Sequence, residues 1–465
     1  MSEIKKNSIH RLKITDMNNL GAGIARLNPP ENSNGEPGEK PIVVFVQGGV
    51  TGDLADVKII KTAKNYLVGR IETLLEPSEF RVAPGCPVSK RCGGCVYRNV
   101  TYEHELECKR RAVENEMRKN HIEVEVEPPL HGSPDGYRNK AQYPVGRTKD
   151  GRIAIGFYAQ RTHEIIDMPE NCRLQPEVFG RITEFLRNFL EKNRIDPYDE
   201  LTGQGIVRHL YLRRSESTGK VMVCIVAARR FRKIEQFAAE ITEKIPETGS
   251  VWLNLNERNT NVVLGESFEL IAGEELCDEL CGKKFTISPG SFWQVNRRMA
   301  EVLYTEAGRL ANIKKGERVL DLFCGIGSVG QAICPVGTKL TGIEIVPAAV
   351  ENARKNALAN GFPDAEYICL DAGDSESVER EIRRIGAQID VILLDPPRGG
   401  CDRRLLEILS EYTPARVVYI SCGPDTLARD LALMRGLGYE IGAVKTVDLF
   451  PRTGHIESLV LLNPN

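Results

Sequence analysis

The sequence has no apolar run of 18 residues, and it has almost no excess of charge of either sign. Without a long apolar run we expect no membrane-spanning helix, and the polar segment Met1–Arg11 does not resemble a secretory signal. We therefore expect a cytoplasmic protein, and by default a monomer. A net charge of −2 excludes bulk affinity for nucleic acid. Any RNA contact must come from local basic groups such as Arg229–Lys233.

The 13 cysteines are not expected to form disulfides in a reducing compartment, so metal binding or catalysis is the better interpretation. Cys86, Cys92 and Cys95 follow a C-x5-C-x2-C spacing, and the Cys-Gly-Gly-Cys turn lets two thiolates converge. The fourth ligand is either Cys108 or Cys172, and we favour Cys172 because it follows a predicted strand and a proline. The residues alone allow a structural zinc or a [4Fe–4S] cluster. The C-x3-C-x2-C spacing typical of radical S-adenosylmethionine enzymes is missing.

A chain of 465 residues is too long for one hydrophobic core, and the pattern changes twice along it. Residues 8–72 contain short strands separated by glycine-rich turns, which predicts a small OB-like β-barrel that could contact RNA. Residues 73–290 are strand-rich with a few helices, so we expect a central α+β domain that holds the cysteine cluster. Residues 291–465 alternate strands and helices, which predicts an α/β domain with a doubly wound, Rossmann-like parallel sheet.

The turn after the first strand of this last domain is rich in glycine. Gly325, Gly327 and Gly330 form a G-x-G-x-x-G pattern, and Glu344 follows nineteen residues after the first glycine. This pattern fits a dinucleotide, but an acidic residue that binds ribose hydroxyls also serves S-adenosylmethionine. We favour the methyl donor because Asp371 ends the third strand, where it could reach an adenine edge. The sequence also shows no later site for a nicotinamide and its hydride acceptor.

Two later apolar segments, which we predict to be strands, are Val391–Leu394 and Val417–Ile420, and each is followed directly by polar residues. The first leads into Asp395-Pro-Pro-Arg398, and the second leads into Ser421 and Cys422. In an open α/β sheet, ligands bind at the carboxyl ends of the strands, so both ends should face one crevice. A carboxylate, an arginine and a thiol in one crevice indicate covalent catalysis with a bound cofactor.

Together, the motifs CGGC, DLFCGIGSVG, DPPRGG, YISCGPDT and the C-terminal DLFP…HIE resemble those of the RNA uracil-5-methyltransferase family. The resemblance covers nearly the whole chain and is strongest to the 23S rRNA branch, which has a TRAM barrel and an iron–sulfur cluster. It implies that Cys422 is the nucleophile and Glu457 the base. It implies that S-adenosylmethionine is bound by Gln294, Phe323, Glu344 and Asp395, and additionally by Asp371. It also implies that a [4Fe–4S] cluster is held by Cys86, Cys92, Cys95 and Cys172.

The resemblance further implies a class I methyltransferase domain at 291–465, and the formation of 5-methyluridine in 23S rRNA through a covalent bond from cysteine to C6. A tRNA enzyme that methylates the T-loop uracil is the nearest alternative, because it shares the catalytic motifs. A nicotinamide oxidoreductase with an iron–sulfur centre would need a flavin or a second dinucleotide site, which the sequence does not show. Gly423 and Arg452 depart from the usual family residues, and these departures bear on the positioning of the pyrimidine.

Overall fold

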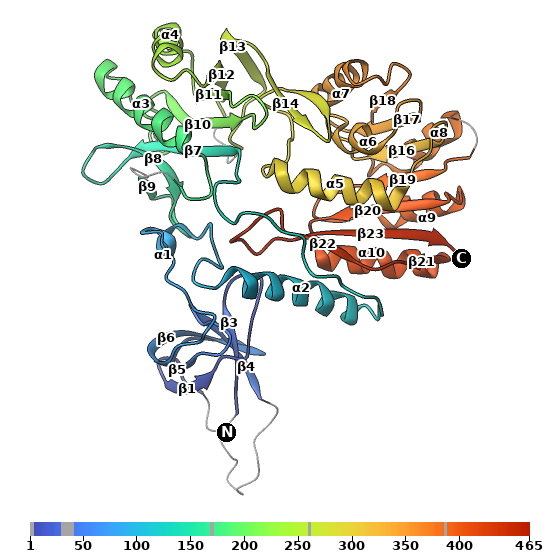
Figure 1. The fold of residues 1–465 in the computed structure, drawn as a ribbon. Helices are drawn as coiled ribbons and strands as arrows, with labels where there is room; N and C mark the ends of the chain where they lie inside the picture. The colour runs from blue at the N-terminus through green and yellow to red at the C-terminus, as the bar shows by residue number, and fades with distance from the viewer. Residues whose placement is uncertain (1–3, 29–40, 168–171, 259–261, 386–387) are drawn as a thin grey trace, which may run out of the picture.

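The computed structural model describes residues 4–28, 41–167, 172–258, 262–385 and 388–465. Three parts follow one another along the chain: a small β-domain, a central sheet with two helices, and a C-terminal α/β domain (Figure 1). No helix among these residues is long and apolar enough to cross a membrane.

The N-terminal part is a six-stranded sheet with the order β1-β5-β6-β4-β3-β2. The strands alternate buried and exposed residues, and Ala25, Val44, Val46, Ala55 and Val57 are fully buried in its core. β1 and β3 also come into contact although they are not neighbours in the sheet, as expected of a sheet that curls into a barrel. The strands are β1 (Ile9–Lys13), β2 (Asp16–Met17), β3 (Gly23–Leu27), β4 (Ile42–Gln47), β5 (Leu54–Thr62) and β6 (Tyr66–Glu76).

A connecting segment with the short helix α1 (Ser89–Cys92) leads to the long helix α2 (Tyr102–Lys119). Val113 and Met117 of α2 are buried in one of the hydrophobic clusters of the C-terminal domain. Figure 1 shows α2 running beneath that domain, beside its last helix. A helix that precedes the central sheet in sequence therefore belongs to the C-terminal core in space.

The central part contains a seven-stranded sheet with the order β13-β12-β11-β10-β7-β8-β9 and the hairpin β14-β15. Helices α3 (Glu177–Asn193) and α4 (Ile234–Lys244) bury apolar residues such as Leu186 and Phe237 against it. Burying one such side chain stabilises the fold by about 1.5–3 kcal/mol. The strands are β7 (Lys140–Arg147), β8 (Ile153–Tyr158), β9 (Ile165–Asp167), β10 (Val207–Arg214), β11 (Val221–Ala227), β12 (Thr248–Leu255), β13 (Ser267–Gly273), β14 (Leu276–Leu280) and β15 (Lys283–Ile287).

The C-terminal part is an eight-stranded sheet in the order β18-β17-β16-β19-β20-β23-β21, with β22 paired to β23. Its strands are β16 (Arg318–Leu322), β17 (Lys339–Glu344), β18 (Glu366–Cys369), β19 (Val391–Leu394), β20 (Arg416–Ser421), β21 (Tyr439–Ile441), β22 (Lys445–Val447) and β23 (Glu457–Pro464). Its helices are α5 (Arg297–Ala311), α6 (Ser328–Ile333), α7 (Pro347–Ala359), α8 (Ser375–Ile385), α9 (Arg403–Glu411) and α10 (Pro424–Gly436).

The first five strands of this sheet are parallel, as the sequence predicts, but β23 runs antiparallel to β20. The predicted doubly wound sheet is therefore confirmed, with an antiparallel strand, β23, added beside β20. Residues 448–456 join β22 to β23, and a connection of that length cannot hold the crossover helix that a parallel strand needs. This reversal turns the start of β23 toward the carboxyl end of β20.

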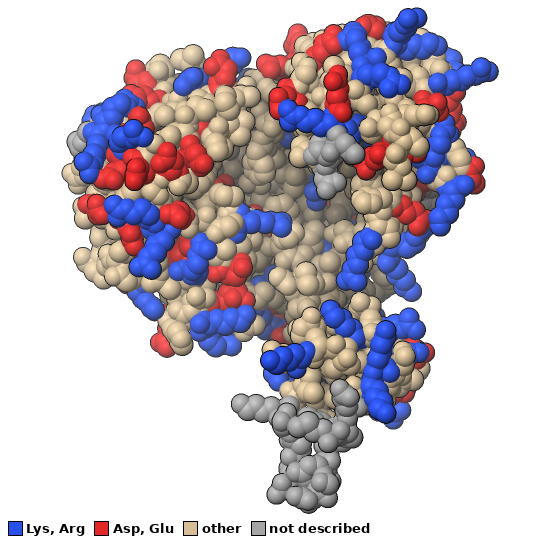
Figure 2. All heavy atoms as spheres, turned by 180° about the vertical axis from the view of Figure 1, so that it is seen from behind, with Lys and Arg blue, Asp and Glu red and all other residues tan. Residues whose placement is uncertain are grey.

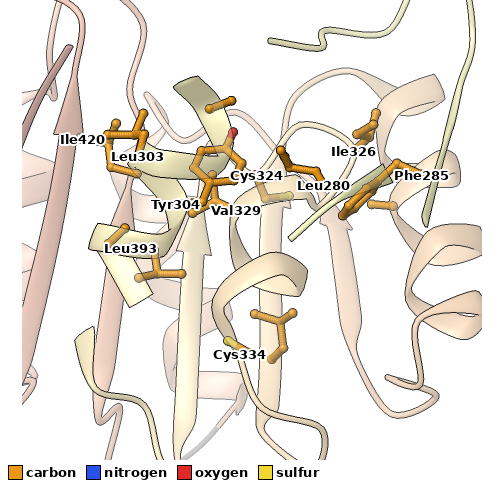
Figure 3. Packing of buried hydrophobic residues seen from close by; sticks show 14 of the residues in the cluster. Leu280, Phe285, Leu303, Tyr304, Cys324, Ile326, Val329, Cys334, Leu393 and Ile420 are labelled. Carbon is orange, nitrogen blue, oxygen red and sulfur yellow. The ribbon is translucent and has the colours of Figure 1, made fainter. Parts of the chain in front are cut away.

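Helix α5 packs its apolar face on the sheet (Figure 3). Leu303 and Tyr304 lie close to Leu393 and Ile420 of the two strands that carry the predicted chemistry. Cys324 and Cys334 are buried in the same cluster. These two cysteines are therefore core residues.

Candidate active site at the carboxyl edge of the sheet

The strand register brings three of the predicted cofactor residues to one edge. Leu322 of β16 pairs with Ile343 of β17 on one side and with Leu394 of β19 on the other. The next residues along these strands are Phe323, Glu344 and Asp395. Their positions are therefore level at the carboxyl end of the sheet, where ligands of open α/β sheets bind.

The reversed strand β23 places the predicted nucleophile and the predicted base side by side. Ser421 of β20 pairs with Ser458 of β23 in antiparallel register. Cys422 follows Ser421 and Glu457 precedes Ser458, so these two residues come opposite each other. Glu457 is only 5% exposed, whereas Cys422 is partly exposed.

Burial is the largest influence on the pKa values of Cys422 and Glu457. Desolvation, and to a smaller extent the nearby charge of Asp395, raises the pKa of Glu457 to about 8. Desolvation also raises the pKa of Asp395 to about 7. The pKa of the Cys422 thiol is raised above its ordinary value, first by burial and then by the charges of Glu457 and Asp395. Two carboxyl groups that titrate near neutral pH beside a thiol form a plausible proton-transfer site.

Arg398 supplies the opposing charge, a role that the sequence analysis left open. It lowers the pKa of both Cys422 and Glu457, although less than burial raises them. Its Nη2 lies 3.2 Å from Nε2 of His455. A guanidinium only donates, so the imidazole nitrogen accepts and the ring is neutral there. Burial, and then Arg398, lowers the pKa of His455.

The charges around Cys422 predict how its reactivity should change with substitution. Glu457→Gln should lower the pKa of the thiol and speed its alkylation a few-fold at fixed pH, whereas Arg398→Met should raise the pKa and slow alkylation. The rate of iodoacetamide labelling of the Cys422 peptide, followed by mass spectrometry across pH, measures both shifts. Two shifts in the same direction would contradict this assignment of the charges.

The glycine-rich turn between β16 and α6 is tightened by the groups around it. Glu344 accepts hydrogen bonds from the backbone N–H groups of Gly325 (3.1 Å) and Val346 (2.9 Å). Gly327 has a φ of +77°, and a Cβ there would clash with Gln331 and Tyr367, so only glycine fits. Phe323 adopts a left-handed conformation with a φ of +65°. The turn thus packs directly against the carboxylate of Glu344, and Gly325 is partly exposed there.

Asp321, which the sequence analysis did not select, lies beneath this turn. It is 1% exposed, and its Oδ2 accepts a hydrogen bond from the N–H of Gly330 at 3.0 Å. Burial raises the pKa of Asp321 to about 8. The only sequence signal was a carboxylate inside an otherwise apolar strand. Its position indicates a role in holding the glycine turn.

Gln294 and Asp371 approach the same edge from opposite sides. Gln294 is 8% exposed, and both its side chain and Asp395 influence the pKa of Tyr304, which is raised mainly by burial. Asp371 accepts a hydrogen bond from the N–H of Gly373 at 2.8 Å. The edge therefore offers acidic groups, a glycine turn and, at Ile345 and Val346, exposed apolar surface. These are the features that a nucleoside cofactor needs, so the residues fit S-adenosylmethionine.

The four predicted cluster cysteines gather in one region near α1. Burial, with smaller contributions from the charges of Cys95, Cys92 and Cys86, raises the pKa of Cys172 to about 11. Cys108 instead has Arg111, Asp16 and Glu107 as its charged neighbours. Within the described residues, no three His, Cys, Asp or Glu side chains converge on a point that could hold a metal ion.

The two departures from the family motifs have different surroundings. A Cβ at Gly423 would lie 2.7 Å from Oγ1 of Thr426, so a larger residue there would require that hydroxyl to move. Arg452 donates to the carbonyl of Val100 (3.0 Å) and to Glu105 (3.2 Å). Its guanidinium thus serves the contact with α2. The expectation that Arg452 bears on the pyrimidine directly has no support in these contacts.

Charged residues of both signs are intermixed over much of the face in Figure 2, and a hollow lies between the central and C-terminal parts. The barrel differs, because its described residues 4–28 and 41–76 contain nine Lys and Arg against five Asp and Glu. This local excess is the kind of basic patch that a chain with a net charge of −2 needs for contact with RNA.

Comparisons with known proteins agree with this geometry. Residues 101–465 match the family described as tRNA (Uracil-5-)-methyltransferase, and residues 5–71 match the TRAM domain. A Clostridium tetani protein called an uncharacterized RNA methyltransferase is 38% identical, covering 99% of this chain and 97% of its own length. A similarly described Oceanobacillus iheyensis protein is 36% identical over the same shares. The crystal structure of Pyrococcus abyssi tRNA (uracil-54, C5)-methyltransferase with S-adenosyl-L-homocysteine has a TM-score of 0.73 at 25% identity, covering 97% of this chain and 99% of that one.

Proposed function

The chain belongs to the tRNA (uracil-5-)-methyltransferase family, and from this premise we propose that it methylates C5 of a specific uridine in 23S rRNA. The family supports S-adenosylmethionine-dependent methylation of RNA uracil, and the fold is that of such a methyltransferase with an N-terminal TRAM domain. The observation that carries the proposed chemistry is the antiparallel register that sets Cys422 opposite Glu457.

The thiolate of Cys422 performs the first step. Uracil C5 is too weak a nucleophile to accept a methyl group unaided, so the thiolate adds to C6 and the electron pair moves into the ring as an enolate. The raised pKa of Cys422 makes a nearby acceptor for the thiol proton necessary, and the carboxylates of Asp395 and Glu457 lie beside it. S-adenosylmethionine, when bound, supplies the electrophilic methyl group that C5 then takes.

Glu457 performs the last step. After transfer, C5 carries both a methyl group and a hydrogen, and this proton must leave before the C6–S bond can break. A carboxylate with a pKa of about 8 is a stronger base than an ordinary glutamate, and it lies opposite the sulfur that departs. Loss of the C5 proton restores the double bond and expels the thiolate of Cys422.

The donor would be held at the carboxyl edge of the sheet by residues at the ends of four strands, β16 to β19, and by Gln294 before α5. We propose Glu344 for the ribose hydroxyls, Asp371 for the adenine edge, and Gln294, Phe323 and Asp395 for the remaining contacts. Their support is the level register of the strand ends and the glycine turn bonded to Glu344. Because C6 of uracil is shielded in stacked RNA, the target base must be unpaired or turned out of its helix.

The choice of 23S rRNA over tRNA depends on the accessory parts. The cysteine segment and the TRAM barrel favour the rRNA branch of the family. A T-loop uridine in tRNA is the second candidate, because the P. abyssi relative, whose name specifies tRNA uracil-54, aligns along almost the whole chain. The cytoplasm, where both RNAs occur, is the proposed location.

One assay separates these targets. The purified protein is incubated with methyl-labelled S-adenosylmethionine and total RNA from cells that lack its gene, and labelled 5-methyluridine is then mapped. We expect label at defined positions of 23S rRNA. Label confined to tRNA would transfer the proposal to the T-loop, and the absence of label from uridine in both RNAs would refute it.

We also propose that Cys86, Cys92, Cys95 and Cys172 hold a [4Fe–4S] cluster. Protein prepared without oxygen should contain iron and sulfide, and Cys172→Ser should lose most of both. Cys108→Ser is the matched control, since burial raises the pKa of Cys108 to about 11 as it does that of Cys172, but the charged neighbours of Cys108 are different. This variant should keep its iron. Zinc in place of iron, or loss of iron only in the control, would contradict the assignment.

A further inference from the structure

The loop that leads into Glu457 is held at four successive peptides by parts of the chain outside the C-terminal sheet. Four successive carbonyl oxygens, those of residues 449–452, each accept a hydrogen bond from a different segment. In chain order, the donors are Nδ2 of Asn296 (3.0 Å), Nζ of Lys109 (3.2 Å), the hydroxyl of Tyr137 (3.0 Å) and the backbone N–H of Tyr97 (3.2 Å). This arrangement restrains the loop along its length.

Lys109 of α2 is the charged centre of this arrangement. Its Nζ lies 2.8 Å from Glu105 and 2.8 Å from Asp448, and the three side chains are at most 1% exposed. Asp448 also accepts a hydrogen bond from the hydroxyl of Tyr102 at 2.8 Å. Arg452 adds a second cation, and both its backbone N–H (2.6 Å) and its guanidinium bind Glu105. Two buried carboxylates are thus balanced by two cations.

Such a network is poor evidence for stability, because burying charges costs free energy that their attraction only partly returns. Its value lies in geometry, since each member can be satisfied in only one arrangement. The last of the four restrained carbonyls, that of Arg452, lies five residues before Glu457. Between them, Gly454 lies so close to Asn19 of the barrel that no Cβ would fit. A shift of the loop would therefore move the carboxylate of Glu457 relative to Cys422.

We propose that Lys109, together with Glu105, Asp448 and Tyr102, is a positioning device that sets Glu457 for removal of the C5 proton. The proposal rests on the proposed function, in which Glu457 is the base. It makes a helix outside the methyltransferase sheet responsible for one step of the reaction. Binding of the methyl donor and attack by Cys422 depend on other strands, so these steps should be spared.

The alternative is that α2 merely docks the connecting segment on the C-terminal domain. A purely structural role would lower folding, donor binding and all reaction steps together. A positioning role instead slows the step after methyl transfer, so that the covalent protein–RNA adduct accumulates. The adduct survives on a denaturing gel and is therefore a readout that simple destabilisation does not produce.

The experiment compares Lys109→Met and Tyr102→Phe with Lys119→Met, which makes the same change at an exposed lysine of the same helix. Lys109→Met should lower turnover by about 10²-fold and accumulate methylated adduct. Tyr102→Phe, which loses one hydrogen bond and should fold normally, should act in the same direction by about 3- to 10-fold. Lys119→Met should behave as the wild type. Circular dichroism and binding of S-adenosylhomocysteine verify folding.

Folded variants whose turnover falls without adduct would overturn the positioning role, as would folded variants with normal turnover. If Lys109→Met fails to fold, Tyr102→Phe decides alone. Glu457→Gln, run in parallel, separates this proposal from the proposed function. Adduct in Glu457→Gln but not in the α2 variants would refute only the positioning role, whereas no adduct in any variant, including Glu457→Gln, would refute Glu457 as the base.

Discussion

Cys422→Ala is expected to lower methyl transfer to RNA by more than about 10⁴-fold while leaving the affinity for S-adenosylmethionine within about threefold of the wild type. The thiolate is the only group of the site that can add to C6 of uracil, and without that addition C5 does not attack the methyl group. Four of the five proposed donor contacts lie at the ends of β16, β17 and β18 and at Gln294, and Asp395, which neighbours Cys422, is unchanged in this variant. Transfer of labelled methyl groups and calorimetric titration with the cofactor measure the two quantities.

Cys277→Ala is the matched control, because Cys277 is a partly buried thiol in the β14–β15 hairpin that serves no proposed step. It should methylate RNA at the wild-type rate. Readily measurable methylation by folded Cys422→Ala protein would rule out covalent catalysis through this residue.

Glu457→Gln is expected to lower turnover by about 10²- to 10⁴-fold and to trap a methylated covalent complex of protein and RNA. The glutamine keeps the size of the side chain but cannot accept the C5 proton, so the C6–S bond persists after transfer. The complex should appear as a slow band on a denaturing gel that carries both labelled methyl and RNA. Glu440→Gln, at an exposed carboxylate of the same sheet, should form no such band.

The pH dependence of the wild-type reaction tests the role of Glu457 as the base, because the carboxyl group acts as a base only when it is deprotonated. Burial raises the pKa of Glu457 to about 8, so the carboxyl is largely protonated, and inactive as a base, below that pH. Release of product from the adduct should therefore speed up as pH rises through about 8 and slow as pH falls. In Glu457→Gln this rise should be absent. A release rate independent of pH between 6 and 9 would contradict the role of Glu457.

Much of the C-terminal fold could be predicted because its strands are continuous apolar runs with polar ends. The strand Val391–Leu394 has the predicted bounds, and the strand at Arg416–Ser421 is one residue longer at each end than predicted. Fully buried parallel strands produce this pattern by burying both faces. The glycine turn could also be predicted from the sequence, because a φ of +77° at Gly327 requires a residue without a side chain.

The sequence by itself determined which chemistry this chain carries: a thiol, carboxylates and an arginine at strand ends, a glycine turn, and a set of spaced cysteines. It could not determine that β23 reverses direction, because strand polarity depends on the connection and on the pairing partners. That reversal alone sets Glu457 opposite Cys422, 35 residues earlier in the chain. The pairing of Lys109 with Asp448, 339 residues apart, was likewise decided only by the tertiary structure. A lysine in a charged helix has the sequence pattern of a solvated face, and only the docking of α2 on the C-terminal domain removes it from water and gives it two carboxylates.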